Sequence, residues 1–216
     1  PMAKIARRDM EKLLIRLRER PSGCSPPLAT QEYMVTGISI GWLGRRRARK
    51  AAAGKAYGGL MKAALAPDFY LTGDVADTFD GRAQMVTVHA ALAIRRMNAL
   101  PGAESAKIAA ALSARVLDGF DAAFREQGVG DSSIARKVRK LAEAHYGLGT
   151  ALSQALDSDG GESAVIAVLE RNGVTQKGRG AALAAYLCAI AMRLEQQDDA
   201  GILAGAIDWV PASEVL

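Results

Sequence analysis

The stretch from Asp131 to Leu152, DSSIARKVRKLAEAHYGLGTAL, decides the fold class of this 216-residue chain. Its apolar stripe falls at helical spacing, three or four residues apart, and consists of Ile134, Val138, Leu141, His145, Leu148 and Leu152. Asp131 or Ser132 stands where a side chain can cap the first free amides of a helix. The stretch therefore predicts a long amphipathic helix.

The same spacing recurs on both sides of this stretch. Met85, Val88 and Leu92 mark a helix over about 79–99, which Pro101-Gly102 closes. A second helix ending at Gly128 is marked by Ile108, Leu112, Leu117, Phe120 and Phe124. Further helices are predicted over 51–66, 162–171 and 177–197, with a polar connection over 68–80 and an ambiguous segment over 202–216. No run alternates with period two for long enough to indicate a sheet, so we predict an all-α protein, a single irregular helical bundle.

Composition limits the class of protein further. Half of the residues are hydrophobic but only 5% are aromatic, so small and aliphatic side chains must fill most of the core. The longest apolar run, Gly180–Met192, is shorter than the roughly 18–20 residues of a membrane span. No signal peptide is evident, so we expect a soluble protein on the cytosolic side. With two cysteines and two histidines and no cluster of them, we expect no disulfide framework, no metal site and no cofactor.

The net charge of +5 is unevenly distributed. Residues 1–50 hold twelve Lys and Arg against four Asp and Glu, whereas residues 51–216 hold 16 against 19. We therefore expect two parts: a flexible basic N-terminal segment (1–50) and a helical domain (51–216). Within the first part, Met10–Arg20 suits a short amphipathic helix and Pro21–Thr30 reads as a linker. Met34 is a plausible alternative start, and we do not expect the first 33 residues to pack with the rest.

Two helix junctions carry the most polar chemistry. In Asp77-Thr78-Phe79-Asp80-Gly81-Arg82, capping by Asp or Thr accounts for part of the pattern, and an Arg–carboxylate clamp to a neighbouring helix would account for the rest. In the second junction, Arg125-Glu126-Gln127-Gly128-Val129-Gly130-Asp131, Gly128 fits the positive-φ position after a helix. Its glycines do not form a phosphate-binding loop, because no strand precedes them and no Gly-Lys-Ser/Thr follows.

Histidines and basic clusters are the other candidates for function. His89 and His145 lie on or beside apolar stripes, where a hydrogen-bonded core role is commoner than catalysis, so we predict no enzyme activity. A short apolar stretch containing Ile38, Ile40, Trp42 and Leu43 is followed by a basic cluster, which consists of Arg45, Arg46, Arg47, Arg49 and Lys50. Such a cluster is usually solvated surface, but next to apolar residues it also suits contact with an anionic membrane surface or a ribosome. Arg136-Lys137-Val138-Arg139-Lys140 forms a second cluster around exposed faces of its helix.

Taken together, residues 57–156 resemble the ubiquinol–cytochrome c chaperone family. The matching stretches are Ala66-Pro67-Asp68-Phe69-Tyr70, Asp77–Arg82 with Met85 and Val88-His89, Arg95-Arg96, Arg125–Asp131, Lys137–Lys140, Tyr146-Gly147 and, more weakly, Glu170-Arg171-Asn172. The chain departs from the family pattern at Ala64, where an arginine is usual, and at Ala83, where an aromatic residue is usual. It also has His145-Tyr146-Gly147-Leu148 in place of Phe-Tyr-Gly-Arg, so two arginines of the family's motif surface are missing.

The resemblance implies a chaperone that holds nascent or newly inserted cytochrome b before haem insertion and promotes assembly of respiratory complex III. For a bacterial member it implies a cytoplasmic protein, peripheral at the inner face of the cytoplasmic membrane. Carried onto this chain, the partner-binding residues would be Pro67, Phe69, Tyr70, Asp77, Thr78, Asp80, Gly81, Arg82, His89, Arg125, Glu126, Gly128, Val129, Gly130, Asp131, Lys137, Lys140 and Tyr146. Trp42, Arg45, Arg46, Arg47, Arg49 and Lys50 would contact membrane or ribosome.

Two other functions remain open from the sequence alone. A helical DNA-binding regulator would suit the length and the arginine cluster, but no helix-turn-helix is readable near the N-terminus, and we expect no sequence-specific nucleic acid as partner. An enzyme would need His89 and His145 to line a common polar pocket.

Overall fold

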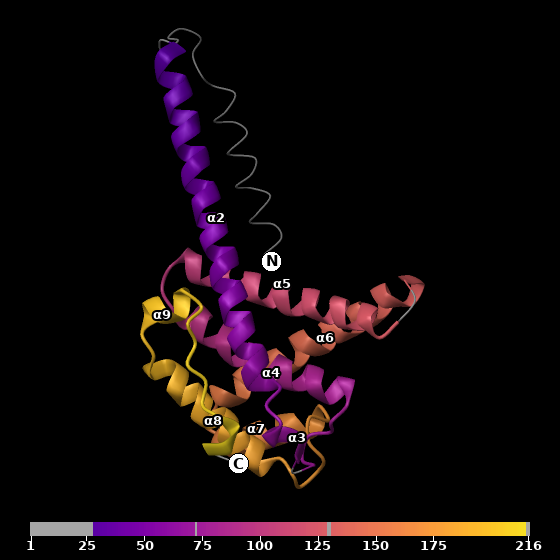
Figure 1. Cartoon of the computed structure of the whole chain (residues 1–216). Helices are drawn as coiled ribbons and strands as arrows, with labels where there is room; N and C mark the ends of the chain where they lie inside the picture. Colours follow the sequence, from indigo (N-terminus) through magenta and orange to yellow (C-terminus); the bar gives the residue numbers. More distant parts are fainter. Residues whose placement is uncertain (1–27, 72, 129–130, 215–216) are drawn as a thin grey trace, which may run out of the picture. The chain divides into compact units, whose positions relative to one another are not determined.

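The computed structural model describes residues 28–71, 73–128 and 131–214. In these residues it contains helices and no strand: α2 (Leu28–Ala64), α3 (Asp68–Leu71), α4 (Phe79–Ala99), α5 (Ala103–Glu126), α6 (Asp131–Leu156), α7 (Gly161–Arg171), α8 (Ala181–Gln196), α9 (Asp199–Leu203) and the 3-10 helix η1 (Ala212–Glu214) (Figure 1). The all-α bundle expected from the sequence is confirmed. The chain divides into two compact units, residues 1–44 and 45–216, and the second contains the helical bundle.

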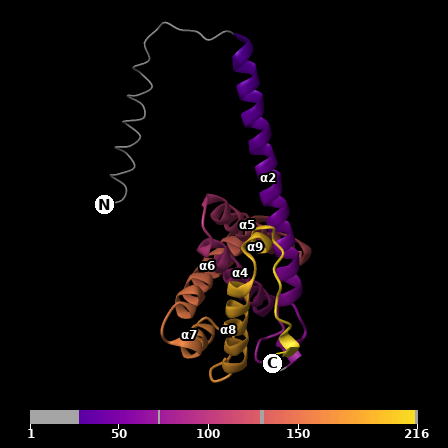
Figure 2. The same cartoon turned by 90° about the vertical axis from the view of Figure 1, so that its left-hand side faces the viewer.

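Helix α4 lies at the centre of the second unit. It packs against α5, α6 and α8, and the C-terminal segment passes beside the later part of α2 (Figures 1 and 2). Every residue from Met85 to Ala93 is buried, so the apolar stripe read from the sequence is only one side of a helix that is covered all round. Its alanines, Ala90, Ala91 and Ala93, allow neighbouring helices to approach closely on several sides.

The first described helix is longer than the sequence indicated. We predicted a start near Ala51, but α2 begins at Leu28 and runs without interruption through Arg45–Lys50. Arg, Lys and Ala are strong helix formers, and nothing in this run ends a helix, so the basic cluster is helical. Of the expected linker, Leu28–Thr30 belong to α2, and the rest lies outside the described residues, as do the expected helix Met10–Arg20 and its surroundings. The division at residue 50 stays a prediction.

Two other boundaries differ from expectation for local reasons. The connection over 68–80 contains α3, because Pro67 opens a turn in which its carbonyl oxygen accepts hydrogen bonds from the amides of Tyr70 and Leu71 at 2.9 and 3.2 Å. Helix α8 begins at Ala181 rather than near 177, since Gly178 has a φ of +81°, which no helix allows. The ambiguous segment after residue 202 consists of the end of α9, an extended segment and η1.

The extended C-terminal segment ties α2 to α8. Gly205 lies so close to the backbone of Ala52 in α2 that any side chain there would collide with it. Asp208 is held by Gln197 through paired hydrogen bonds of 2.8 and 2.7 Å and by Arg193 at 2.7 Å. Trp209 packs on α4 and α2, with its ring 5.3 Å from that of His89. The segment thereby fixes the position of the later part of α2 against the bundle.

Candidate functional site

The junction before α4 is capped by Thr78. Its Oγ1 accepts a hydrogen bond from the Gly81 amide at 3.1 Å, as one of the two candidate caps was expected to do. Arg82 donates from Nε to Asp77 Oδ1 at 2.7 Å. We expected Arg82 to pair with a carboxylate on a neighbouring helix, but both partners belong to the junction itself, because Asp77 turns back over the first turn of α4. Asp80 is exposed in that first turn.

Arg82 also joins the junction to α3. Its guanidinium carbon lies 5.0 Å from the centroid of the Tyr70 ring, a cation–π distance. The Tyr70 hydroxyl donates to the carbonyl oxygen of Ala64 at 3.1 Å, which connects α3 to the end of α2. Burial raises the pKa of Tyr70 to about 12, against a smaller opposing effect of Arg82, so the hydroxyl stays protonated and remains a donor. The predicted residues Tyr70, Asp77 and Arg82 thus form one connected group.

The junction between α5 and α6 lies at the same end of the bundle. Arg125 pairs with Asp121 one turn earlier, with Nε and Oδ2 2.8 Å apart, and Gly128 adopts a φ of +71° after the helix end, as predicted. Glu126 is exposed, whereas Val129, Gly130 and the side chain of Asp131 lie outside what the structure describes.

Two aromatic rings bring the two junctions together. Phe79, at the start of α4, lies 4.8 Å from Phe124 near the end of α5, measured between ring centroids. Lys137 of α6 places its Nζ 5.8 Å from the centroid of the Phe124 ring. Sequence reasoning assigned Phe124 to a helix stripe and gave Phe79 no role. A general rule could have indicated this contact: consecutive helices in a bundle tend to run antiparallel, which places the start of α4 beside the end of α5.

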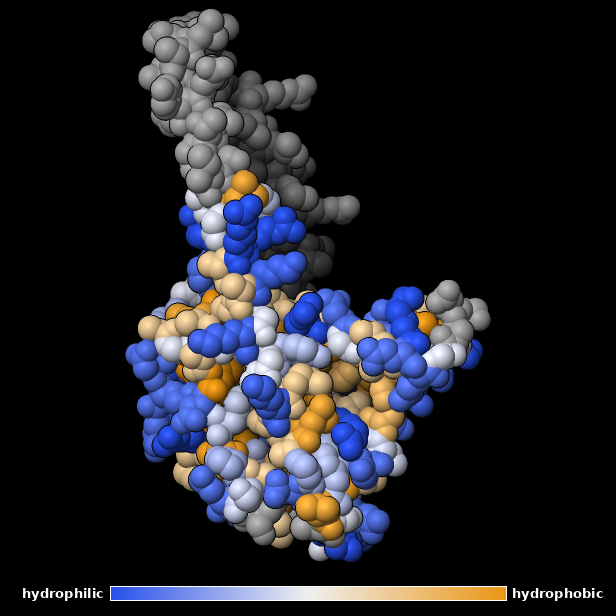
Figure 3. All heavy atoms as spheres, in the orientation of Figure 1, coloured by the Kyte–Doolittle hydropathy of each residue, from blue (hydrophilic) through white to orange (hydrophobic). Residues whose placement is uncertain are grey.

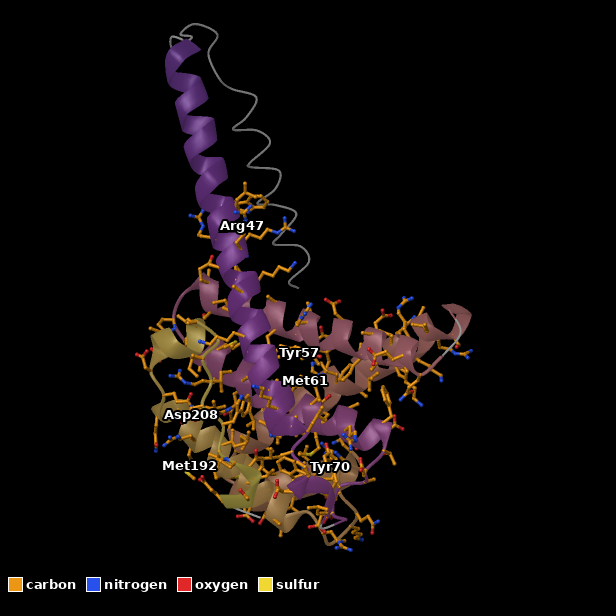
Figure 4. All side chains as sticks on the ribbon, in the orientation of Figure 1. Arg47, Tyr57, Met61, Tyr70, Met192 and Asp208 are labelled. Atoms are coloured by element: carbon orange, nitrogen blue, oxygen red, sulfur yellow. The ribbon has the colours of Figure 1, made fainter. Side chains whose placement is uncertain are left out.

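A groove opens beside these junctions. Its cavity has a volume of about 170 Å³ and is bounded by Tyr57, Met61 and Leu65 of α2, by Phe79, Arg82, Ala83 and Val86 of α4, and by Gly119, Phe120 and Ala123 of α5. We call it the α2–α4–α5 groove. Figure 3 shows a recess with apolar side chains on this face, and Figure 4 shows Tyr57 and Met61 side by side on α2. Apart from the Tyr57 hydroxyl and Arg82, the lining side chains are apolar.

Glycine 119 shapes the wall of this groove. A side chain at Gly119 would collide with the Tyr57 hydroxyl, so the glycine allows α2 and α5 to approach here. The Tyr57 ring is covered on another side by Arg115, whose guanidinium carbon is 5.7 Å from the ring centroid. Burial raises the pKa of Tyr57, which therefore stays neutral in the groove wall.

Two predicted contact residues lie in the core. His89 is fully buried, with Nδ1 2.8 Å from the Met85 carbonyl oxygen and Nε2 3.1 Å from the Tyr186 hydroxyl. Phe69 packs edge-on against both rings, with centroids 5.7 Å from His89 and 4.9 Å from Tyr186. Burial lowers the pKa of His89 to about 4, so the ring is neutral. Neither side chain can touch a client in this conformation, because α3, α8 and the C-terminal segment cover them.

A second cavity lies on another side of α4. It has a volume of about 520 Å³, is bounded by α4, α5 and α6, and contains His145 and Tyr146 in its wall; we call it the α4–α5–α6 groove. The predicted residue Tyr146 is therefore separated from the two junctions. It is 56% exposed, and the Ser113 hydroxyl lies 3.3 Å from its own. Thr87 holds Nδ1 of His145 at 3.1 Å, so the two histidines occupy different surroundings.

The remaining predicted residues differ in how exposed they are. Pro67 and Lys140 are exposed, and Gly81 is buried where any side chain would collide with the Ala76 carbonyl oxygen. In the basic cluster, Arg49 pairs with Glu104 of α5 at 3.2 Å, while Trp42, Arg45, Arg46, Arg47 and Lys50 are exposed.

Among the described residues, no three His, Cys, Asp or Glu side chains are grouped so as to hold a metal ion. In the same residues, none of the helices combines the length and the apolar character that crossing a bilayer requires.

Arg95 and Arg96, which supported the resemblance, tie helices together. Arg95 bonds Asp157 at the end of α6 and Glu195 of α8, at 2.7–3.0 Å. Arg96 is nearly buried and donates to the carbonyl oxygens of Leu194 and Gln197 and to Asp199. Both arginines therefore stabilise the bundle.

Comparison with known proteins supplies the family. The model of one family, described as Ubiquinol-cytochrome C chaperone, matches residues 72–209. Among solved structures, the crystal structure of the Cbp3 homolog from Brucella abortus matches with 27% identity and a TM-score of 0.71, and the match covers 82% of this chain and 99% of that one. A search of curated proteins found no match. The family match extends well past residue 156, beyond which the sequence offered only the weaker match at Glu170-Arg171-Asn172, and so takes in α7, α8 and the C-terminal segment.

Proposed function

The chain belongs to the ubiquinol-cytochrome C chaperone family, and from this premise we propose that it is an assembly chaperone of respiratory complex III whose client is newly made cytochrome b. The observation that carries the proposal is the family match over 72–209, which includes both helix junctions and the α4 and α5 walls of the α2–α4–α5 groove. The similarity to the Cbp3 homolog supports the same family role. Family membership points to a non-enzymatic protein.

The α2–α4–α5 groove is the proposed contact for a client segment. Its volume of about 170 Å³ is below the roughly 300 Å³ of typical small-molecule sites, so it suits an anchoring side chain rather than a whole ligand. An amphipathic or apolar helix lying across the groove would insert such a side chain between Met61 and Phe120. Burying an apolar side chain there would contribute about 1.5–3 kcal/mol.

Charged groups at the rim would orient that segment. Asp77 and Arg82 lie at the mouth, Asp80 is exposed one turn away, and the Phe79–Phe124 contact brings Arg125 and Glu126 to the same end. Exposed pairs of this kind add little stability to the fold but can select polar groups on a partner. These five charged residues are our proposed rim contacts.

The basic cluster of α2 would place the chaperone near its client. In the proposal, Arg45, Arg46, Arg47 and Lys50 attract an anionic membrane surface or a ribosome, and Trp42 anchors at the lipid interface. In a bacterium this would be the inner face of the cytoplasmic membrane. The DNA-binding alternative has less support, since α2 runs straight through the cluster and the described residues there contain no helix-turn-helix.

A complementation experiment tests the function. We expect deletion of the gene to lower complex III while leaving the other respiratory complexes nearly intact, and wild-type protein to restore it. Met61→Trp should fail to restore complex III, because the indole fills the groove. Met192→Trp is the matched control, since Met192 is an exposed methionine on α8 away from the groove (Figure 4). Normal complex III in the deletion strain would contradict the proposal.

A further inference from the structure

The α4–α5–α6 groove has walls of unusually small side chains. They come from all three helices and include Ala91, Ala106, Ala109, Ala110, Gly149 and Thr150. Small side chains at a helix interface let two backbones approach closely, which strengthens van der Waals contact along their length. These walls therefore favour a partner that is itself a helix with small or apolar side chains.

The length and shape of the groove agree with a helical occupant. Along α6 the lining runs from His145 to Asp157, about 18 Å at 1.5 Å per residue, or some three turns. An adjoining cavity shares Arg95, Asn98, Ser153 and Asp157 and continues to Glu195 of α8. A valley between three packed helices is the place where a fourth helix completes a bundle.

A buried histidine lies in the wall of the groove. His145 is only 4% exposed, and its Nδ1 is engaged by the Thr87 hydroxyl. Its ring also lies beside that of Tyr146 in the same wall, with centroids 5.4 Å apart. Burial lowers the pKa of His145 and keeps the ring neutral, so Nδ1 and Nε2 share one proton. The ring therefore adds no charge to the wall of the groove.

One end of the groove carries an excess of negative charge. Arg95 is shared by two carboxylates, Asp157 and Glu195, whose side chains are 59% and 55% exposed. The neighbouring Arg96 is matched by Asp199, so the group as a whole has a charge of −1. An occupant with a cationic end would place that end here, where Coulomb attraction favours it.

We infer that the α4–α5–α6 groove binds an apolar helix that carries Lys or Arg at one end. This is the chemistry of a membrane-spanning segment at its positively charged flank. The inference rests on the proposed function in so far as the client is a membrane protein. It assigns a second contact surface on α4, apart from the α2–α4–α5 groove.

Peptide binding to the full-length chain tests the inference. The probe is a fluorescein-labelled helical peptide of about 20 Leu and Ala residues ended by a run of Lys, compared with the same peptide ended by Glu. We expect fluorescence anisotropy to give a Kd at least roughly tenfold lower for the Lys-ended peptide. Ala110→Trp should raise that Kd roughly tenfold by filling the groove. Ala122→Trp, at a position of the same helix outside the lining, should leave it unchanged.

A charge reversal measures the electrostatic contribution to peptide binding separately. Glu195→Lys leaves the Arg95–Asp157 pair in place but should remove the preference for the Lys-ended peptide, whereas Glu143→Lys, at an arginine-paired surface glutamate outside the lining and the acidic end of the groove, should not. Equal affinity for the two peptides, or binding unaffected by Ala110→Trp, would overturn the inference. Binding lost in Met61→Trp but kept in Ala110→Trp would also overturn it, while leaving the proposed chaperone function standing. Normal complex III in the deletion strain would instead refute the function.

Discussion

Arg82 is the residue on which the proposed rim contact depends most. Its pair with Asp77 is about half exposed on both sides, and such pairs contribute about 0–1 kcal/mol. We therefore expect Arg82→Ala to lower the free energy of unfolding by no more than about 1–2 kcal/mol, including the lost contact with the Tyr70 ring. Complementation by this variant should nevertheless be impaired. Urea denaturation measures the first effect, with Arg139→Ala as a control at another exposed pair. A fully unfolded variant would show that Arg82 serves the fold and not the client.

The surroundings of Gly81 leave no room for a side chain, whereas those of Gly58 do. A methyl group at Gly81 would collide with the backbone carbonyl of Ala76, so Gly81→Ala should destabilise the protein by about 1–3 kcal/mol. At Gly58, inside α2, an added methyl group would meet no other part of the protein within 4 Å, so Gly58→Ala should stabilise the helix by about 0.5–1 kcal/mol. Thermal melts of the two variants check the opposite signs. Equal shifts in Tm would contradict the close approach at the α4 junction.

The buried His89 gives stability a defined dependence on pH. Its pKa is about 4 in the folded protein and 6.5 when exposed, so the unfolded chain binds the extra proton between these values. The free energy of unfolding should therefore fall as the pH drops from about 6.5 to about 4, by up to about 3 kcal/mol. His145, whose pKa is also lowered, acts in the same direction. Urea titrations over this range, repeated with His89→Gln, should show a smaller pH effect in the variant.

At the residue scale, local chemistry was predictable and tertiary contacts were not. The cap at Thr78 and the positive φ of Gly128 follow from residue types at helix ends. The Phe79–Phe124 contact joins residues 45 positions apart and depends on how the helices pack. The hydrogen-bonded core role expected for His89 agrees with the structure, but the rings around it could not be predicted for the same reason: Tyr186 and Trp209 come from the far end of the chain.

At the element scale, periodicity predicted the long helices well. The bounds of α4 agree with the apolar pattern, because its start coincides with the Thr78 cap, and α6 contains the whole predicted stripe. The pattern failed for α2, whose basic run carries no apolar stripe, and for α3, which is too short to show a period. It also could not place the C-terminal segment, whose structure comes from contacts with other helices rather than from its own sequence.

The C-terminal segment should be necessary for the position of α2. Trp209 packs between His89 and Gly59, where a Cβ would come within 3.4 Å of the indole nitrogen. Removing a partly buried Trp leaves a cavity, so Trp209→Ala should cost about 2–4 kcal/mol. Hydrogen exchange should speed up in α2 between Ala52 and Ala64 more than in α6. Equal effects on both helices would contradict a specific tie between this segment and α2.

Within the compact unit of residues 45–216, the central helix α4 forms one wall of two grooves that differ in size and charge. The α2–α4–α5 groove is narrow and apolar and lies beside the two helix junctions, whereas the α4–α5–α6 groove is wider, has small side chains and ends in net negative charge. A client with several apolar helices could contact both. The junctions could be read as sequence motifs, whereas the residues that line each groove could not, since a groove arises where helices diverge and no short motif encodes that.

The central claim is that newly made cytochrome b occupies the α2–α4–α5 groove. The most direct measurement is site-specific photocrosslinking with a photoreactive amino acid at Met61 of the full-length chain, in membranes synthesising cytochrome b. We predict a crosslink to cytochrome b from Met61, a weaker one after Arg82→Ala, and none from the exposed Met192 on α8. Crosslinks of equal yield from Met61 and Met192, or none from Met61, would contradict the claim.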